Sequence, residues 1–128
     1  MSEYKLTLKG IHHVYGNKAD DETEAIKHID LNVRDGEFLA IVGASGCGKS
    51  TLLNIMCGMI EPSEGEVLID GDSISSGKHR IGYISQTDTL LPWRKIESNV
   101  ALGLEIEGIS KKERLEQARK MIALSGME

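Results

Sequence analysis

The chain has 128 residues and a formal net charge of −5 at pH 7. This length allows one hydrophobic core, and this charge argues against a general nucleic-acid binder, which usually has a basic surface. Hydrophobic residues make up 40% of the chain, yet no apolar run approaches the roughly 18 residues of a membrane span, and the N-terminus lacks the apolar core of a signal peptide. The two cysteines, Cys47 and Cys57, have no metal-site spacing and are expected to be reduced.

The first third of the chain is predicted to form strands. Residues 4–9 alternate between apolar and polar side chains, which predicts a half-buried strand that ends near Tyr15. Residues 29–33 repeat this alternation and predict a second strand. Asp35 and Gly36 then predict a tight turn into the fully apolar run 38–42, which we expect to be a buried strand.

A glycine-rich motif follows this run. It consists of Gly43, Ala44, Ser45, Gly46, Cys47, Gly48, Lys49, Ser50 and Thr51. The spacing, glycine followed after four residues by Gly-Lys-Ser, is that of the Walker A phosphate loop. The bare pattern is expected by chance in about one per cent of chains of this composition. Its place between an apolar run and a predicted helix makes a nucleotide site a better interpretation than an ordinary glycine-rich turn.

Each residue type in the motif suits phosphate chemistry. Glycines without a Cβ let the backbone N–H groups point inward at a phosphate, and the N-terminus of the next helix adds partial positive charge. Lys49 supplies a cation for the β- and γ-phosphates, and the Ser50 hydroxyl suits Mg²⁺. We expect Thr51 to meet the α-phosphate, and Cys47 to be a spacer whose thiol could make the site sensitive to alkylation.

The rest of the chain alternates between predicted helices and short strands. Apolar residues at helical spacing from Leu52 to Ile60 predict a helix that ends by Pro62. Residues 66–69 predict an extended segment and residues 81–84 a second short strand. Pro92 favours a loop before a short amphipathic helix over residues 96–104.

The last predicted helix has signals at both of its ends. Ser110 and Glu113 have the spacing of a capping box, so a helix is expected to begin there. Leu115, Ala118 and Ile122 give this helix one apolar stripe. Gly126 suits its C-terminal cap.

Together these stretches resemble the ATPase subunit of an ATP-binding-cassette (ABC) transporter. The resemblance implies an α/β phosphate-loop core with an antiparallel β layer over residues 1–105, and the start of a helical subdomain over residues 106–128. Gln86 stands where the family has its Q-loop glutamine, which implies contacts with Mg²⁺ and the attacking water and a catalytic role beside Lys49. Tyr15 stands where the family has an aromatic side chain that stacks on adenine.

A shorter stretch indicates a branch of the family. Residues 90–94 and 99–105 look like those of the nitrate, sulfonate and taurine importers. The resemblance then implies ATP and Mg²⁺ as cofactors, and ATP hydrolysis that drives import of a small anion. It also implies transmembrane permease subunits, a second ATPase subunit and, indirectly, an external solute-binding protein as partners, with no nucleic acid. We expect a cytoplasmic protein on the inner face of the membrane, and we expect Trp93 to contact the membrane subunit.

The sequence also departs from the family pattern. It contains no Leu-Ser-Gly-Gly-Gln signature, no apolar strand followed by an Asp-Glu pair and no switch histidine. Asp70 follows an apolar run but precedes Gly71, so we interpret it as a turn residue, and residues 124–126 only imitate the start of the signature. We therefore expect the N-terminal half of an ABC ATPase, which alone would be inactive.

Two alternatives remain open from the sequence. The chain could bind nucleotide without turnover, or it could belong to an ABC ATPase that has no membrane partner. The stretch 90–105 speaks against the second alternative.

The four histidines show no metal spacing; they are His12, His13, His28 and His79.

Overall fold

The computed structural model describes residues 3–16 and 21–127. The chain divides into two compact units, Met1–Tyr83 and Ile84–Glu128. The division into residues 1–105 and 106–128, which the family resemblance implies, concerns the intact protein and stays a prediction.

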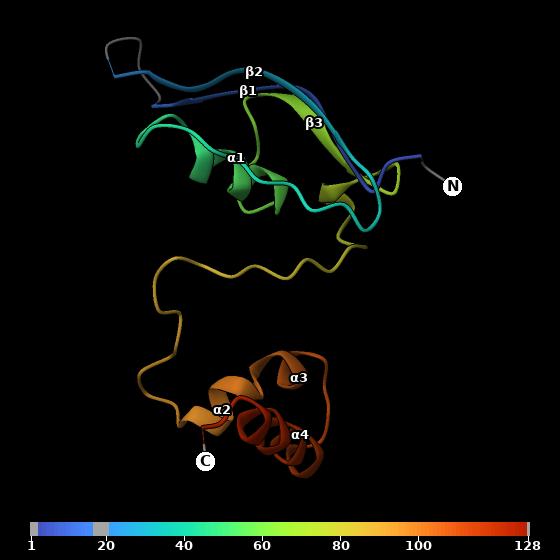
Figure 1. The fold of residues 1–128 in the computed structure, drawn as a ribbon, viewed down its shortest axis with the longest axis vertical. Coiled ribbons are helices and arrows are strands. Elements are labelled where there is room, and N and C mark those ends of the chain that lie inside the picture. Colours follow the sequence, from blue (N-terminus) through green and yellow to red (C-terminus); the bar gives the residue numbers. More distant parts are fainter. Residues whose placement is uncertain (1–2, 17–20, 128) are drawn as a thin grey trace. The chain divides into compact units, whose positions relative to one another are not determined.

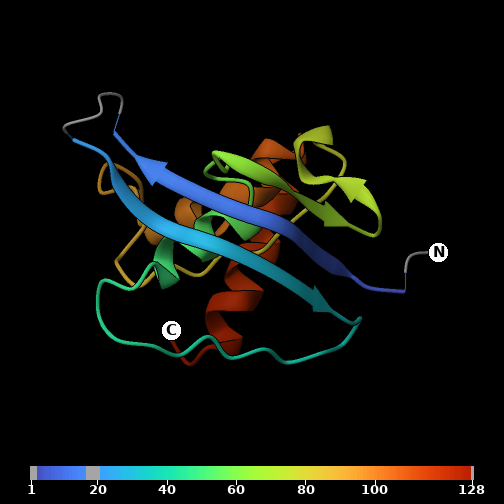
Figure 2. The same cartoon turned by 90° about the horizontal axis from the view of Figure 1, so that it is seen from above.

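The first unit is built on an antiparallel sheet. Its strands are β1 (Leu6–Tyr15), β2 (Thr23–Val33), β3 (Glu64–Ile69) and β4 (Asp72–Ser73), in the order β2-β1-β3-β4. A short 3₁₀ turn, η1 (Ile74–Ser76), follows β4. Leu8 faces Leu31 of β2 on one side and Val67 of β3 on the other, so β1 is the central strand of the three long ones (Figure 2). The strands predicted from alternation are confirmed, and β2 begins earlier than expected.

A bulge in β1 changes which side chains face inward. The register with β2 shifts between Leu8 and Ile11, where Gly10 has a φ of 57° and its N–H donates to Asp30 Oδ1 at 2.7 Å. Leu8, Ile11 and His13 are all buried, at spacings of three and then two residues. A regular strand would not bury these three together, because side chains alternate between its two faces.

Helix α1 (Lys49–Met56) lies against one face of this sheet (Figure 1). The core between them is aliphatic and consists of Leu8, Ile11, Ile26, Leu52, Ile55 and Val67. Burying each of these side chains contributes about 1.5–3 kcal/mol. The packing fixes the start of α1, and therefore the phosphate loop, against β1 and β2.

Two predicted strands are not present, which corrects the sequence-based expectation. Residues 37–44 and 78–85 form no strand in the described structure. Phe38 and Val42 have 93% and 89% of their surface exposed, so the run 38–42 is not the buried strand that was expected. A fully apolar strand is stable only with neighbouring strands and covering layers on both faces, and no described strand pairs with either segment.

The second unit is helical. It contains α2 (Ile96–Val100), α3 (Leu102–Ile106) and α4 (Lys111–Leu124), with Ala101 and Ala118 buried. The helix predicted over residues 96–104 is present as two short helices.

The caps predicted for α4 are present at both ends. Ser110 Oγ accepts a hydrogen bond from Glu113 N at 3.4 Å at the N-terminus. Gly126, with a φ of 74°, follows the C-terminus. Among the described residues, no helix is long and apolar enough to cross a membrane.

Candidate functional site: the phosphate loop

The phosphate loop meets α1 at Gly48, and only glycine fits there. Gly48 is the N-cap of α1 with a φ of 93°, a region that L side chains rarely adopt. A Cβ on Gly48 would also overlap the carbonyl oxygen of Ala25 in β2. The third glycine of the motif therefore allows both the left-handed turn and the close approach of the loop to the sheet.

Lys49 folds back over its own loop. Its Nζ donates to the carbonyl oxygens of Gly43 at 2.7 Å and Ala44 at 2.6 Å, and lies 3.5 Å from Cys47 Sγ. An ammonium group held at this position is suited to neutralising anionic oxygens. The structure thus brings the cation and the glycine-rich backbone of the motif together.

The helix N-terminus adds to this positive field. The first turn of α1 contains no acidic residue, so no carboxylate of that turn offsets the partial charge of its free N–H groups. Ser50 is exposed and Thr51 is half-buried in the same turn. A cation at Lys49 beside the end of a helix is an arrangement that binds phosphate.

Tyr15, from the end of β1, reaches the same helix turn. Its hydroxyl lies 3.1 Å from Thr51 Oγ1, in hydrogen-bond contact. Its ring lies perpendicular to that of His13, at an interplanar angle of 88° with the ring centroids 4.6 Å apart. The structure therefore places Tyr15 beside the loop. The sequence did not point to His13, because its burial depends on the bulge in β1.

Gln86 and Trp93 belong to the second unit. Gln86 is exposed and lies in irregular backbone, not at the end of a strand as predicted, because no strand forms over residues 78–85. Trp93 has 77% of its surface exposed, on the loop before α2 that Pro92 predicted. The catalytic and metal-binding roles of Gln86 stay predictions.

The two cysteines differ in their surroundings. Cys47 is exposed beside Lys49, and Cys57 is half-buried after α1, where burial raises the pKa of its thiol. A raised pKa keeps the Cys57 thiol protonated and unreactive. Among the described residues, no cluster of three or more His, Cys, Asp or Glu side chains could hold a metal ion.

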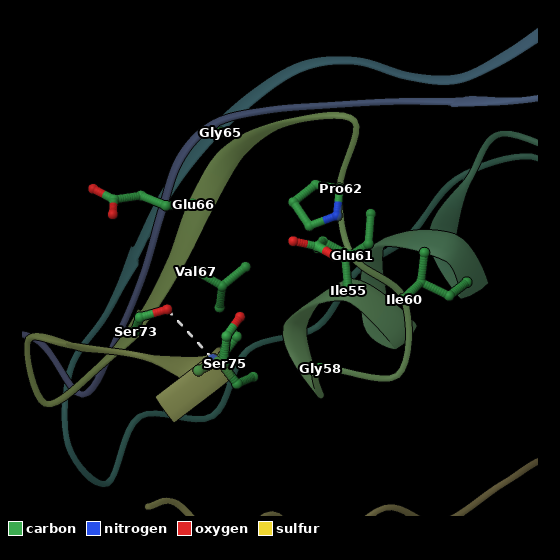
Figure 3. Close-up of a pocket in the computed structure, with 11 residues that line it drawn as sticks. Ile55, Gly58, Ile60, Glu61, Pro62, Gly65, Glu66, Val67, Ser73 and Ser75 are labelled. Atoms are coloured by element: carbon green, nitrogen blue, oxygen red, sulfur yellow. Dashed lines mark hydrogen bonds between the residues drawn. The ribbon is translucent and has the colours of Figure 1, made fainter. Parts of the chain in front are cut away.

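Of two cavities in the first unit, one is lined by residues of the phosphate loop and the other is not. One, of about 420 Å³, lies between β2 and the loop and is lined by Ile41, Cys47, Gly48 and Lys49 among others. The other, of about 450 Å³, lies between the end of α1 and the hairpin of β3 and β4, where Ser75 N donates to Ser73 Oγ at 3.3 Å (Figure 3). The second cavity contains no residue of the motif, so the chemistry of the loop belongs with the first.

A sequence profile of the family described as ABC transporter matches residues 26–128. This match includes the whole phosphate loop and most of the chain. The chain belongs to the ABC transporter family. The proteins and solved structures that are similar to this chain include ATP-binding proteins of this family.

Several curated ABC proteins are similar to this chain. An uncharacterized ABC transporter ATP-binding protein, MJ0412 of Methanocaldococcus jannaschii, is 44% identical over 127 residues, which are 97% of this chain and 46% of that protein. The taurine import ATP-binding protein TauB of Escherichia coli K12 is 37% identical over 123 residues, or 96% of this chain and 46% of TauB. The chain thus spans about half the length of the curated relatives it matches.

A solved structure of the same kind supports the ABC fold. It is the dimeric, post-hydrolysis ATP-binding cassette MJ0796 bound to ADP and Pi, with a TM-score of 0.83 and 31% identity. The match covers 96% of this chain and 58% of that one. The α/β fold class predicted from the phosphate loop and the antiparallel strands is confirmed.

Proposed function

We propose that the chain binds Mg-ATP at residues 43–51 and that the intact protein hydrolyses it. The observation that carries this proposal is the position of Lys49 Nζ, held by the carbonyl oxygens of Gly43 and Ala44 beside the N-terminus of α1. Donor N–H groups, a helix dipole and one cation at the same place fit a triphosphate.

Each residue of the loop has a separate task in this proposal. Lys49 holds the β- and γ-phosphates and neutralises charge that develops on the γ-phosphoryl oxygens. The exposed Ser50 hydroxyl and phosphate oxygens would hold Mg²⁺, since oxygen ligands suit this hard cation. Mg²⁺, when bound, supplies further neutralisation of the phosphates. Thr51 would meet the α-phosphate. The role of Gln86 towards the metal and the water rests on the family resemblance alone.

A Lys49→Ala variant tests the binding site. Losing a charge-assisted contact of about 1.5–3 kcal/mol should lower ATP affinity at least tenfold in calorimetry. Lys9→Ala is the matched control, because Lys9 pairs with Glu66 on the sheet at 3.0 Å and is not part of the loop. Equal ATP affinity for the wild type and Lys49→Ala would refute the site.

We infer that the intact protein energises import of a small anion such as nitrate, a sulfonate or taurine. The similarity to TauB and the stretch 90–105 support this branch of the family. On this proposal the protein works as a homodimer on the cytoplasmic face of permease subunits, which receive solute from an external binding protein.

The loop that carries Trp93 is firmly held, which suits a docking element. Asn99 accepts from Leu91 N at 2.8 Å and donates to the carbonyl oxygens of Leu91 and Arg94, each at 3.2 Å. Arg94 in turn pairs with Glu105 at 2.8 Å. An exposed tryptophan on a loop held in this way suits a residue that dominates a protein interface.

A Trp93→Ala variant tests whether this loop contacts the permease. Losing the ring should reduce co-purification of the chain with the membrane subunits by about tenfold or more, since interface tryptophans are among the residues most costly to truncate. Met121→Ala, at an exposed position on α4, is the matched control. Unchanged recovery of the membrane subunits with Trp93→Ala would exclude the contact.

A further inference from the structure

The ring of Tyr15 is held from two directions in the described structure. Its hydroxyl is in hydrogen-bond contact with Thr51 Oγ1 at 3.1 Å, which ties the far end of the ring to the first turn of α1. The ring itself packs perpendicular to His13, with the centroids 4.6 Å apart. Tyr15 nonetheless keeps 42% of its residue surface exposed, so the side chain is not enclosed by the core.

His13 is anchored on its other side. Only 7% of its surface is exposed, and its Nδ1 lies 3.4 Å from Ser63 Oγ, in the loop that leads to β3. Ser63 Oγ also accepts from Val14 N at 3.1 Å. The imidazole therefore cannot move without disturbing both β1 and the loop before β3.

One nitrogen of His13 makes no hydrogen bond. Its Nε2 is buried and has no hydrogen-bond partner among the described residues. A buried nitrogen without a partner is destabilising. Within residues 3–16 and 21–127, the imidazole makes its ring contact with Tyr15.

We propose that His13 is a positioning residue for the nucleotide base. It fixes the plane of the Tyr15 ring, while Thr51 fixes the ring's far end, so that an adenine meets a platform already in place. Edge-to-face ring pairs have a preferred geometry, and a side chain ordered before binding loses less entropy when the ligand arrives. This inference rests on the proposed role of Tyr15 in adenine stacking.

The proposal concerns binding of the base and not of the phosphates, so it can be tested by measuring the two contributions to affinity separately. ATP and inorganic triphosphate share the phosphate loop, but only ATP has a base. Loss of folded protein would lower the apparent affinity for both ligands alike. The ratio of the two affinities therefore reports on the platform and not on stability.

The experiment is a double-mutant cycle in the purified chain, with calorimetry of Mg-ATP and Mg-triphosphate. His13→Ala should weaken ATP about twofold to tenfold and leave triphosphate unchanged. Tyr15→Ala should abolish this effect, because His13 acts through that ring. His13→Phe, which keeps a ring against Tyr15, should restore ATP affinity.

The matched control is His12→Ala. His12 neighbours His13 in β1 but pairs with Glu24 at 3.1 Å and is not part of the ring contact. It should leave the ratio of ATP to triphosphate affinity unchanged.

The outcomes distinguish this inference from the proposed function. If Tyr15→Ala weakens ATP selectively but His13→Ala does not, or if the two losses add, the positioning role is refuted. If Tyr15→Ala weakens both ligands equally, stacking by Tyr15 itself fails.

Discussion

Lys49 shows at the scale of a single residue how the loop holds its own cation. The Nζ donates to the carbonyl oxygens of Gly43 and Ala44, so phosphate oxygens compete with these carbonyls for the three donors of the ammonium group. The free energy of binding is therefore a difference between two sets of hydrogen bonds, which explains why one lysine contributes only a few kcal/mol. The backbone around it is set independently by Gly48, whose conformation excludes other residues.

Tyr15 is predicted to contribute through its ring more than through its hydroxyl. Tyr15→Phe keeps the stacking surface and loses one hydrogen bond to Thr51, so ATP affinity should fall by no more than about tenfold, the equivalent of about 0.5–1.5 kcal/mol. Tyr15→Trp should also be tolerated. Calorimetry with ATP checks both variants, and a loss with Phe as large as with Ala would show that the hydroxyl is the essential group.

The helices of the second unit depend on ion pairs that join one element to the next. Glu105 of α3 contacts both Arg94, which precedes α2, and Arg114 of α4, at 2.8 and 3.5 Å. Arg119 of α4 pairs with Glu97 of α2 at 3.1 Å. Because α2 and α3 have only five residues each, they depend on such tertiary contacts more than on their own helix propensity.

Glu105 should make these helices sensitive to acid. Hydrogen bonds from Arg94 hold the pKa of Glu105 below its ordinary value of 4.5, so its contribution to stability is present above that pH. It is lost as the pH falls below 4.5 through the folded-state pKa. We expect Glu105→Gln to be less stable than the wild type at pH 7, with the difference in melting temperature shrinking towards pH 3.

Circular dichroism of thermal unfolding across this pH range measures that difference. Because these side chains are partly exposed, high salt should reduce it at pH 7. A difference in melting temperature that stays constant from pH 7 to pH 3 would show that Glu105 acts through packing and not through its charge.

On the proposed function, the chain supplies groups that would hold a nucleotide but not a complete set for hydrolysis. Lys49, Ser50 and Gln86 suit phosphate and metal, while the sequence contains no Asp-Glu pair after an apolar strand, no signature and no switch histidine. A general base is typically worth about 10²–10⁴ in rate. Binding without efficient turnover is therefore the expected behaviour of these 128 residues.

Phosphate release by the purified chain measures this directly. We expect steady-state turnover far below about 1 s⁻¹, the low end for ordinary enzymes. Lys49→Ala controls for contaminating ATPases. Turnover near that rate, abolished in Lys49→Ala, would reveal a base among the residues present.

The sequence by itself determined the features that depend on neighbouring residues. The phosphate loop, the cap at Ser110 and the alternation in β1 each follow from side chains a few positions apart, whose chemistry acts locally. This is why the motif, the α/β class and the ends of α4 could be predicted.

The tertiary structure decided the features that need a distant partner. The apolar run 38–42 has strand chemistry but no described strand beside it, so it forms no ladder. The bulge at Gly10 buries His13, and only the packing of α1 on the sheet brings Thr51 to the Tyr15 hydroxyl. Backbone pairing and ring contacts join residues far apart in the chain, and a local pattern carries no information about such partners.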